Sequence, residues 1–208
     1  AYAVVDCSGN ERGGSYSHRW YKSAFRRIAV IVRGGEKRGT INRRLDDIGL
    51  PKVQKLRKKQ KLPRRLPTAP VAIVWSPLPD GSPNVDANEP RYFWPGKDWV
   101  DWVGTDFYSR YGSWKHLKKF YSVFAKGKNK PFALTEWGLW GEDQPKYVKK
   151  VFRFMKQRDY ADMLIYYQDF GSSNEFRIQN FPRSKKALKK KISSDRFPKF
   201  AKKYPRFR

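Results

Sequence analysis

The chain has few of the residues that build metal sites, disulfides or histidine-activated nucleophiles. Its 208 residues include one cysteine, Cys7, and two histidines, His18 and His116. A single cysteine forms no internal disulfide, and no histidines, cysteines and carboxylates recur at the spacing of a metal site. The Gly-x-Ser-x-Gly turn that presents a serine nucleophile is absent too. We therefore expect no metal, no cofactor and no serine–histidine–aspartate chemistry.

Long apolar runs are also missing. No stretch of about 18 or more apolar residues occurs, so a membrane-spanning helix is excluded. The first residues lack the basic start and apolar stretch of a signal peptide. The sequence opens instead on a strand-like segment, residues 2–5, which indicates that upstream sequence is missing from this chain.

Acidic residues are scarce relative to basic ones. The chain has 19 Asp and Glu against 46 Lys and Arg, a formal net charge of +27. This charge predicts attraction to polyanions such as nucleic acid, anionic membranes or acidic polysaccharides. Much of it lies in residues 52–65 and 183–208. We interpret these runs as solvated helix faces and a basic tail at residues 193–208, because charge governs association more than fold.

What the chain does contain is a regular alternation of apolar and amphipathic segments. Continuous apolar runs of about five residues suit strands buried on both faces of a parallel sheet. Such runs occupy residues 2–5, 71–75, 99–104, 131–136 and 163–167. Helical apolar spacing occurs over residues 17–32, 114–124, 144–158 and 184–192. The alternation predicts one α/β domain over residues 1–208, with residues 36–69 as a basic, irregular insertion that contributes little to the core.

Polar and aromatic side chains follow the predicted strands. The strand ends carry Asp6, Trp75, Asp106 with Tyr108, Glu136, and Gln168 with Asp169. The carboxyl ends of parallel strands meet at one edge of the sheet, so we expect these side chains to gather there. Glu136 is followed by an aromatic and glycine-rich stretch, residues 137–141, and by no immediate helix. Aromatic faces beside carboxylates are what a sugar-binding surface needs, because pyranose rings stack on indole.

Three sequence blocks carry a family resemblance. The segment 131–138, Pro-Phe-Ala-Leu-Thr-Glu-Trp-Gly, resembles the nucleophile strand of family 26 glycoside hydrolases, the β-mannanases of the large retaining (β/α)8 clan. Residues 92–96 and 101–108 look like the block that precedes it, and residues 74–77 are similar to the family's fifth strand. The blocks occur in the family's order within residues 71–141. The resemblance implies a TIM (β/α)8-type barrel of which this chain covers about the last five βα units.

The same resemblance implies a function and a set of site residues. It implies a secreted hydrolase that cleaves a β-linked, mannan-like polysaccharide by a retaining two-carboxylate mechanism. Glu136 would be the nucleophile and Tyr108 the neighbour that hydrogen-bonds and orients it. Counting back from Gly9 places the acid/base at Asp6, and Glu11 is the alternative. Sugar contacts are expected from the remaining strand-end and aromatic residues, namely Trp75, Trp94, Asp106, Trp137, Trp140 and Gln168.

Two departures keep other interpretations open. The family reads glutamate where this chain has Asp6, one methylene shorter, which points to a catalytically impaired carbohydrate-binding barrel remnant as one alternative. The charge points to a second, a basic protein that binds a polyanion or nucleic acid, although the chain has no zinc-finger spacing and no Lys/Arg-Gly-Phe signature. Five strands do not close a barrel, so the sequence also predicts self-association or a first half supplied elsewhere.

Overall fold

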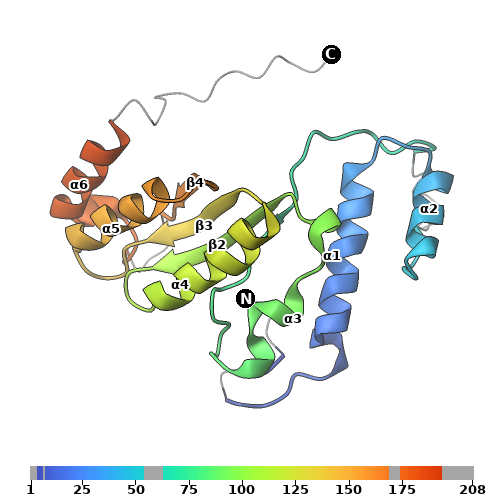
Figure 1. Cartoon of the computed structure of the whole chain (residues 1–208), viewed down its shortest axis with the longest axis horizontal. Coiled ribbons are helices and arrows are strands. Elements are labelled where there is room, and N and C mark those ends of the chain that lie inside the picture. The colour runs from blue at the N-terminus through green and yellow to red at the C-terminus, as the bar shows by residue number, and fades with distance from the viewer. Residues whose placement is uncertain (1–3, 7, 54–62, 169–173, 194–208) are drawn as a thin grey trace.

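The computed structural model describes residues 4–6, 8–53, 63–168 and 174–193. At its centre is a parallel sheet whose four strands follow one another in chain order (Figure 1). The strands are β1 (Val74–Trp75), β2 (Trp102–Tyr108), β3 (Phe132–Gly138) and β4 (Ala161–Tyr166). Sequential parallel strands need a crossover between each pair, and helices supply these crossovers.

Six α-helices accompany the sheet within the described residues: α1 (His18–Arg33), α2 (Arg38–Asp47), α3 (Pro90–Phe93), α4 (Trp114–Phe120), α5 (Pro145–Lys156) and α6 (Pro182–Ile192). A π-helix, η4 (Tyr121–Ala125), continues α4. Short 3-10 helices are η1 (Gly14–Tyr16), η2 (Asp86–Asn88), η3 (Lys97–Trp99), η5 (Lys126–Lys128) and η6 (Ile178–Asn180). Figure 1 shows α4 and α5 along the sheet, and α1 and α2 away from it.

The main core lies between one face of the sheet and helices α4, η4 and α5. Trp75, Phe132 and Trp137 are at most 1% exposed and point from the strands toward these helices. Trp75 stacks on Phe120 of α4 at 5.7 Å between ring centroids, and Trp137 meets Phe152 of α5 at 6.0 Å. Because side chains alternate along a strand, the neighbours of these residues point to the opposite face of the sheet.

Four of the predicted strand segments overlap the four strands of the sheet. The first predicted strand differs. Residues 2 and 3 lie outside the described residues, and Val5 makes an antiparallel bridge with Glu11 instead of joining the parallel sheet. The N–H groups of Val4 and Val5 donate to Asn88 Oδ1 at 2.9 and 3.1 Å. A buried asparagine therefore takes up the backbone groups that a neighbouring strand would have bound.

The predicted helices are confirmed as α1, α4 with η4, α5 and α6. The prediction of an irregular segment at residues 36–69 is wrong in part, because it contains α2. Ile41 and Leu45, four residues apart on one face of α2, are 1% and 0% exposed. Two apolar residues at helical spacing anchor this helix despite its polar composition. Residues 54–62 and 194–208 lie outside the described residues, and with them all but the first residue of the predicted basic tail.

Candidate active site

Two carboxylates face each other across neighbouring strands on the side of the sheet opposite the helices. Asp106 of β2 and Glu136 of β3 are register partners near the carboxyl ends of their strands. Tyr108, two residues after Asp106 and hence on the same face, donates its hydroxyl hydrogen to Glu136 Oε1. The structure thus forms the contact between Tyr108 and Glu136 that the sequence analysis expected.

A β-bulge shapes this edge of the sheet. The register of β2 and β3 shifts after Thr105, so that Thr135 is an extra residue on β3. Bulges re-aim side chains and are frequent beside active sites. Thr135 Oγ1 donates to Asp106 Oδ1 at 3.3 Å and lies 2.5 Å from Ser76 Oγ. The bulge therefore brings Thr135 onto the face that carries the two carboxylates.

The strands are tightly packed around Gly104, two residues before Asp106 on β2. A Cβ at Gly104 would lie 2.5 Å from Thr135 Cγ2 and 3.0 Å from Val74 Cγ1. Both contacts are closer than side-chain carbons approach one another, so glycine at this position lets β1, β2 and β3 pack below the site.

Burial and neighbouring groups shift the pKa values of Asp106 and Tyr108. Burial, followed by the negative charge of Glu136, raises the pKa of the Asp106 carboxyl, while the Thr135 hydroxyl opposes this. Burial and the hydrogen bond to Glu136 raise the pKa of Tyr108, which stays a neutral donor. A raised pKa favours the protonated form of Asp106, which is the form that a proton donor needs. Among the described residues, no three His, Cys, Asp or Glu side chains gather as a metal site would require.

Aromatic rings surround Tyr108. Its ring lies 5.5 Å from Trp140, 5.3 Å from Phe176 and 6.1 Å from Tyr167, in each case edge-on. Trp140 is half-buried, and its indole N–H donates to Glu175 Oε2 at 3.2 Å. The structure therefore places Trp140, a predicted sugar contact, one side chain away from Glu136.

Comparison with known proteins gives a match in structure alone. No family model matches the chain, and none of the curated proteins does. A family 26 (GH26) β-mannanase from Bacteroides ovatus is 19% identical, with a TM-score of 0.52 over 95% of this chain and 50% of that one. The fold is that of part of this (β/α)8-type barrel. The catalytic domain of the Bacillus sp. JAMB-750 GH26 endo-β-1,4-mannanase matches at 14% identity and a TM-score of 0.49, covering 95% of this chain and 49% of that one.

The predicted fold class, a partial (β/α)8-type barrel, is confirmed. The chain spans about half the length of the mannanase structures that it matches. In a barrel of this kind the helices form the outer ring and the carboxyl ends of the strands form the catalytic face. Asp106, Tyr108 and Glu136 accordingly lie on the inner side of the barrel sheet, toward the carboxyl ends of its strands.

Two predicted sugar-binding tryptophans are corrected by this geometry. Trp75 is 0% exposed and Trp137 is 1% exposed, so neither ring offers a face to a sugar. Trp137 directly follows the inward-facing Glu136 on β3 and therefore points outward, into the helix layer. Trp94 is half-buried on the same outer side, 4.9 Å from the Trp75 ring. Trp75 and Trp137 belong to the hydrophobic core of the barrel, and Trp94 packs against it with its ring partly exposed.

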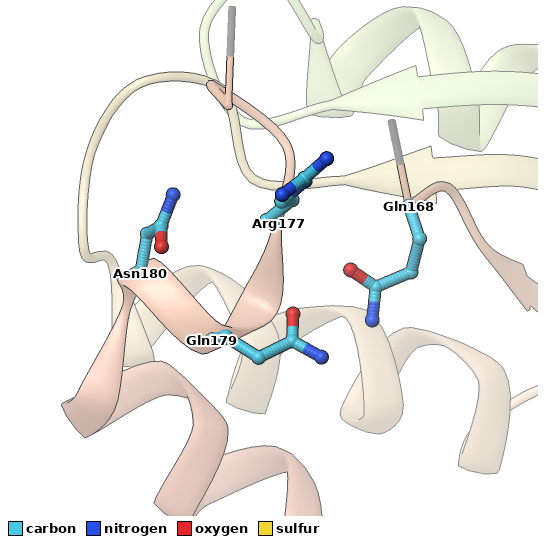
Figure 2. A pocket seen from close by; sticks show the side chains of 4 residues that line it. All are labelled: Gln168, Arg177, Gln179 and Asn180. Carbon is cyan, nitrogen blue, oxygen red and sulfur yellow. The ribbon is translucent and has the colours of Figure 1, made fainter. Parts of the chain in front are cut away.

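Gln168, just beyond β4, lines a cavity. Its Oε1 accepts from the Ile178 N–H at 3.2 Å. Gln168, Arg177, Gln179 and Asn180 border a cavity of about 340 Å³, and Figure 2 shows the side chains of Gln168 and Gln179 turned toward the same space. Sequence reasoning missed the last three residues. The available signal was a run of long polar side chains in the segment after the last strand.

The predicted acid/base candidates, Asp6 and Glu11, lie in an N-terminal turn that is closed by the bridge between Val5 and Glu11. Asp6 Oδ1 accepts from the N–H groups of Ser8 and Asn10, each at 2.9 Å. The hydrogen bond from Asn10 is the main reason why the pKa of Asp6 is lowered. A general acid needs the opposite shift. Glu11 is exposed, and within the described residues no hydrogen bond or ion pair joins Asp6 or Glu11 to Glu136. Asp169 lies outside the described residues.

Proposed function

We propose that the protein is a retaining glycoside hydrolase that cleaves a β-linked, mannan-like polysaccharide. The observation that carries this proposal is the Glu136 carboxylate, held by Tyr108 beside Asp106 on the inner face of a glycoside-hydrolase-like barrel. The carboxyl ends of barrel strands are where catalytic groups of this fold occur. Mannan is the substrate class named for the Bacteroides relative, and it comes to this chain as part of the proposal.

Glu136 is the nucleophile in this proposal. Its ionised carboxylate attacks the anomeric carbon, and a bond to the Glu136 oxygen forms as the glycosidic bond breaks. Tyr108 donates to Oε1 and so fixes the plane of the carboxylate before the attack. A water molecule then attacks the same carbon, releases the sugar and frees Glu136 for another cycle.

Asp106 is our candidate for the acid/base. It protonates the departing glycosidic oxygen and later takes a proton from the attacking water. Asp106 and Glu136 are register partners on neighbouring strands, so both carboxyls can reach one sugar, as a two-carboxylate mechanism needs. The raised pKa of Asp106 also favours the protonated form that the first step needs. Asp6 and Glu11 remain the alternatives, with Asp6 disfavoured by its lowered pKa.

The surroundings of the carboxylates supply the polysaccharide contacts. Trp140 offers a partly exposed ring beside Tyr108, and the cavity at Gln168 offers amide and guanidinium donors to sugar hydroxyls. A closed barrel of this class has eight strands, so strands beyond the four described would come from a second copy or another polypeptide segment. We further propose that the protein acts outside the cell, where polymeric substrates of this kind occur.

Hydrolysis of a panel of β-glycans by the parent protein and by Glu136→Gln tests the proposal. We expect the parent to release reducing ends from mannan, and the variant to be slower by at least about 10³-fold, because the amide is a poor nucleophile. Glu142→Gln, an exposed glutamate in the following loop, is the control and should keep the parent rate.

A covalent intermediate provides a second readout. A fluorinated mannosyl donor that forms a long-lived glycosyl-enzyme should label Glu136, and mass spectrometry of peptides locates the label. Equal rates for the parent and Glu136→Gln would rule out the assigned nucleophile. A parent that binds mannan without hydrolysing it would favour the alternative of an impaired carbohydrate-binding barrel.

A further inference from the structure

The outer helices of the half-barrel present only basic charge. Together, helices α4, η5, α5 and α6 contain no aspartate and no glutamate. Their exposed charged residues are Lys115, Lys118, Lys119, Lys126, Lys128, Lys146, Lys149, Lys150, Arg153, Lys156, Arg183, Lys185, Lys186, Lys189, Lys190 and Lys191. We call this set the basic helix layer. A solvated helix surface normally carries charges of both signs, so the absence of acids in all four helices sets this surface apart.

Helix α5 shows how the charges are ordered. Lys146, Lys149, Lys150, Arg153 and Lys156 fall within about 120° of arc around the helix axis, because residues three and four apart share a face. The opposite side carries the buried residues that pack on the sheet. These five positive charges therefore lie along about 15 Å of the helix axis, at a rise of 1.5 Å per residue.

The helices of the layer are continuous in space. Trp114 of α4 lies 6.0 Å from Phe154 and 6.1 Å from Tyr147 of α5, and α5 packs against α6 (Figure 1). The layer lies on the outer side of the sheet, whereas Glu136 faces the inner side. A polymer held on these helices would therefore leave the candidate active site open.

Little of this charge is neutralised within the described part of the chain. Arg183 pairs with Asp143 at 3.5 Å, and the Lys150 ammonium lies 4.4 Å above the Trp114 ring. No ion pair is recorded there for Lys146, Lys149 or Arg153. Like charges spaced along one surface repel each other, and a polyanion that binds them relieves this repulsion and releases its own counterions.

We propose that the basic helix layer binds an acidic polysaccharide of the polyuronate kind and holds the protein on a charged glycan. The choice of a glycan rests on the proposed function. A polyuronate carries one carboxylate per sugar, and this row of negative charges complements the lysines of the layer.

The side chains of the layer also argue against other polyanions. Lysines greatly outnumber arginines, and the guanidinium fork that grips phosphate in two hydrogen bonds is present only at Arg153 and Arg183. Within these helices no aromatic side chain is exposed, so bases of a single strand have no ring on which to stack. An amphipathic helix that inserts into a membrane needs an exposed apolar face, and the apolar face of α5 is buried in the core.

Binding to polygalacturonate, a carboxylated homopolymer, tests the proposal. The Glu136→Gln protein is used beside the parent, so that binding is measured apart from any hydrolysis. We expect retention on polygalacturonate at about 0.05 M salt and loss of binding toward about 0.5 M, with no binding to neutral dextran. The triple variant Lys146→Gln, Lys149→Gln, Arg153→Gln should bind about tenfold to a hundredfold more weakly.

The control variant carries the same change in net charge at exposed positions elsewhere, Arg19→Gln, Arg43→Gln and Lys97→Gln. It should keep its affinity within about threefold, because scattered surface charges contribute little. Equal losses in both variants, or no binding to polygalacturonate, would overturn the proposal. So would displacement of polygalacturonate by duplex DNA or by anionic phosphatidylserine vesicles at equal charge concentration. Hydrolysis of mannan tests the proposed function, and retention on polygalacturonate tests the basic helix layer. The failure of one measurement with success of the other shows which of the two proposals is wrong.

Discussion

Asp106 and Glu136 are the side chains whose chemistry depends most on each other. If Asp106 is the proton donor, Asp106→Asn should lower kcat/KM on polysaccharide by about 10²–10⁴-fold. An aryl mannoside with a good leaving group needs no proton and should lose much less. In pH–rate profiles, activity should fall as pH rises through the raised pKa of Asp106, because the donor must be protonated. In Glu136→Gln the neighbouring charge is gone, so the pKa of Asp106 should move down.

The matched variant for this prediction is Asp6→Asn. If Asp6→Asn shows the leaving-group dependence and Asp106→Asn does not, the acid belongs to the N-terminal segment and our assignment is wrong. Stability gives a separate check. A carboxyl whose folded-state pKa is raised weakens the fold as pH rises through that pKa, since the ionised form is disfavoured in the folded protein. Asp106→Asn should therefore unfold at a slightly higher temperature than the parent at neutral pH.

Trp137 distinguishes a core residue from a sugar contact. It is 1% exposed, and its Nε1 has no hydrogen-bond partner in the described structure. Trp137→Ala should cost about 3–5 kcal/mol of unfolding free energy, whereas Trp137→Phe keeps an aromatic ring, removes the unpaired N–H and should cost less than about 1.5 kcal/mol. Denaturant unfolding measures both. A raised KM for mannan in Trp137→Phe with unchanged stability would contradict the core assignment.

The site residues show what sequence can and cannot specify. Glu136 and Tyr108 were predicted from local motif and strand position, and the contact between them follows from two strands side by side. The error at Trp137 came from neglecting alternation, because adjacent residues of a strand point to opposite faces. The Asp6 side chain and backbone both bind the turn that follows it, and the aspartate–cysteine–serine–glycine–asparagine stretch was a local signal for this turn. The electrostatic coupling of Asp106 to Glu136 was not predictable, since it depends on register.

At the level of elements, the N-terminus of α6 is capped by a side chain from a distant segment. Its N-terminal N–H groups are bound by Asp143, whose Oδ2 accepts from Arg183 N at 3.0 Å and Oδ1 from Ser184 N at 2.8 Å. Although partial burial acts to raise it, the hydrogen bonds from Ser184 and Arg183 lower the pKa of Asp143. Asp143 thus acts as the N-cap that Phe181, in the cap position, does not provide.

Asp143→Ala should lower the unfolding free energy by about 0.5–2 kcal/mol at neutral pH. A lowered folded-state pKa means that this contribution is present above the ordinary aspartate pKa and disappears as pH falls through the lower, folded value. The stability difference between parent and variant should therefore shrink in strongly acidic solution. Thermal unfolding over a pH series measures it. Glu142→Ala is the neighbouring control, and an equal effect there would show that loop charge, not the cap, matters.

Elements with strong periodicity were the most predictable. Helix α5 has a long apolar stripe, and its buried side follows from spacing alone. In α1, by contrast, only Ala29 is buried, and Trp20, Ile28 and Val32 are exposed. Helix α2 was missed because only Ile41 and Leu45 mark its buried side among polar residues. The bulge at Thr135 was not predictable either, since an extra residue in one strand is defined by its partner strand. The order of the four strands, by contrast, followed from the alternation of strands and helices.

At the scale of the whole molecule, a net charge of +27 on 208 residues opposes compaction. The described ion pairs neutralise only part of it, and the basic helix layer gathers like charges on one surface. Repulsion of this kind acts over the screening length of the solution, about 10 Å at 0.1 M salt and about 3 Å at 1 M. The charge that would hold a polyanion therefore also lowers the stability of the free protein at low salt.

The unfolding temperature should accordingly rise as sodium chloride increases from about 0.05 to about 0.5 M, because screening relieves repulsion in the compact state. The triple variant Lys146→Gln, Lys149→Gln, Arg153→Gln removes three of these charges and should show a smaller rise, with a higher starting value at low salt. Calorimetry or circular dichroism at fixed pH measures both. A parent whose unfolding temperature stays flat or falls with salt would show that attractive ion pairs outweigh the repulsion. In that case counterion release alone would account for the affinity of a bound polyanion. The bound polyanion would then stabilise the folded protein only through the binding equilibrium itself.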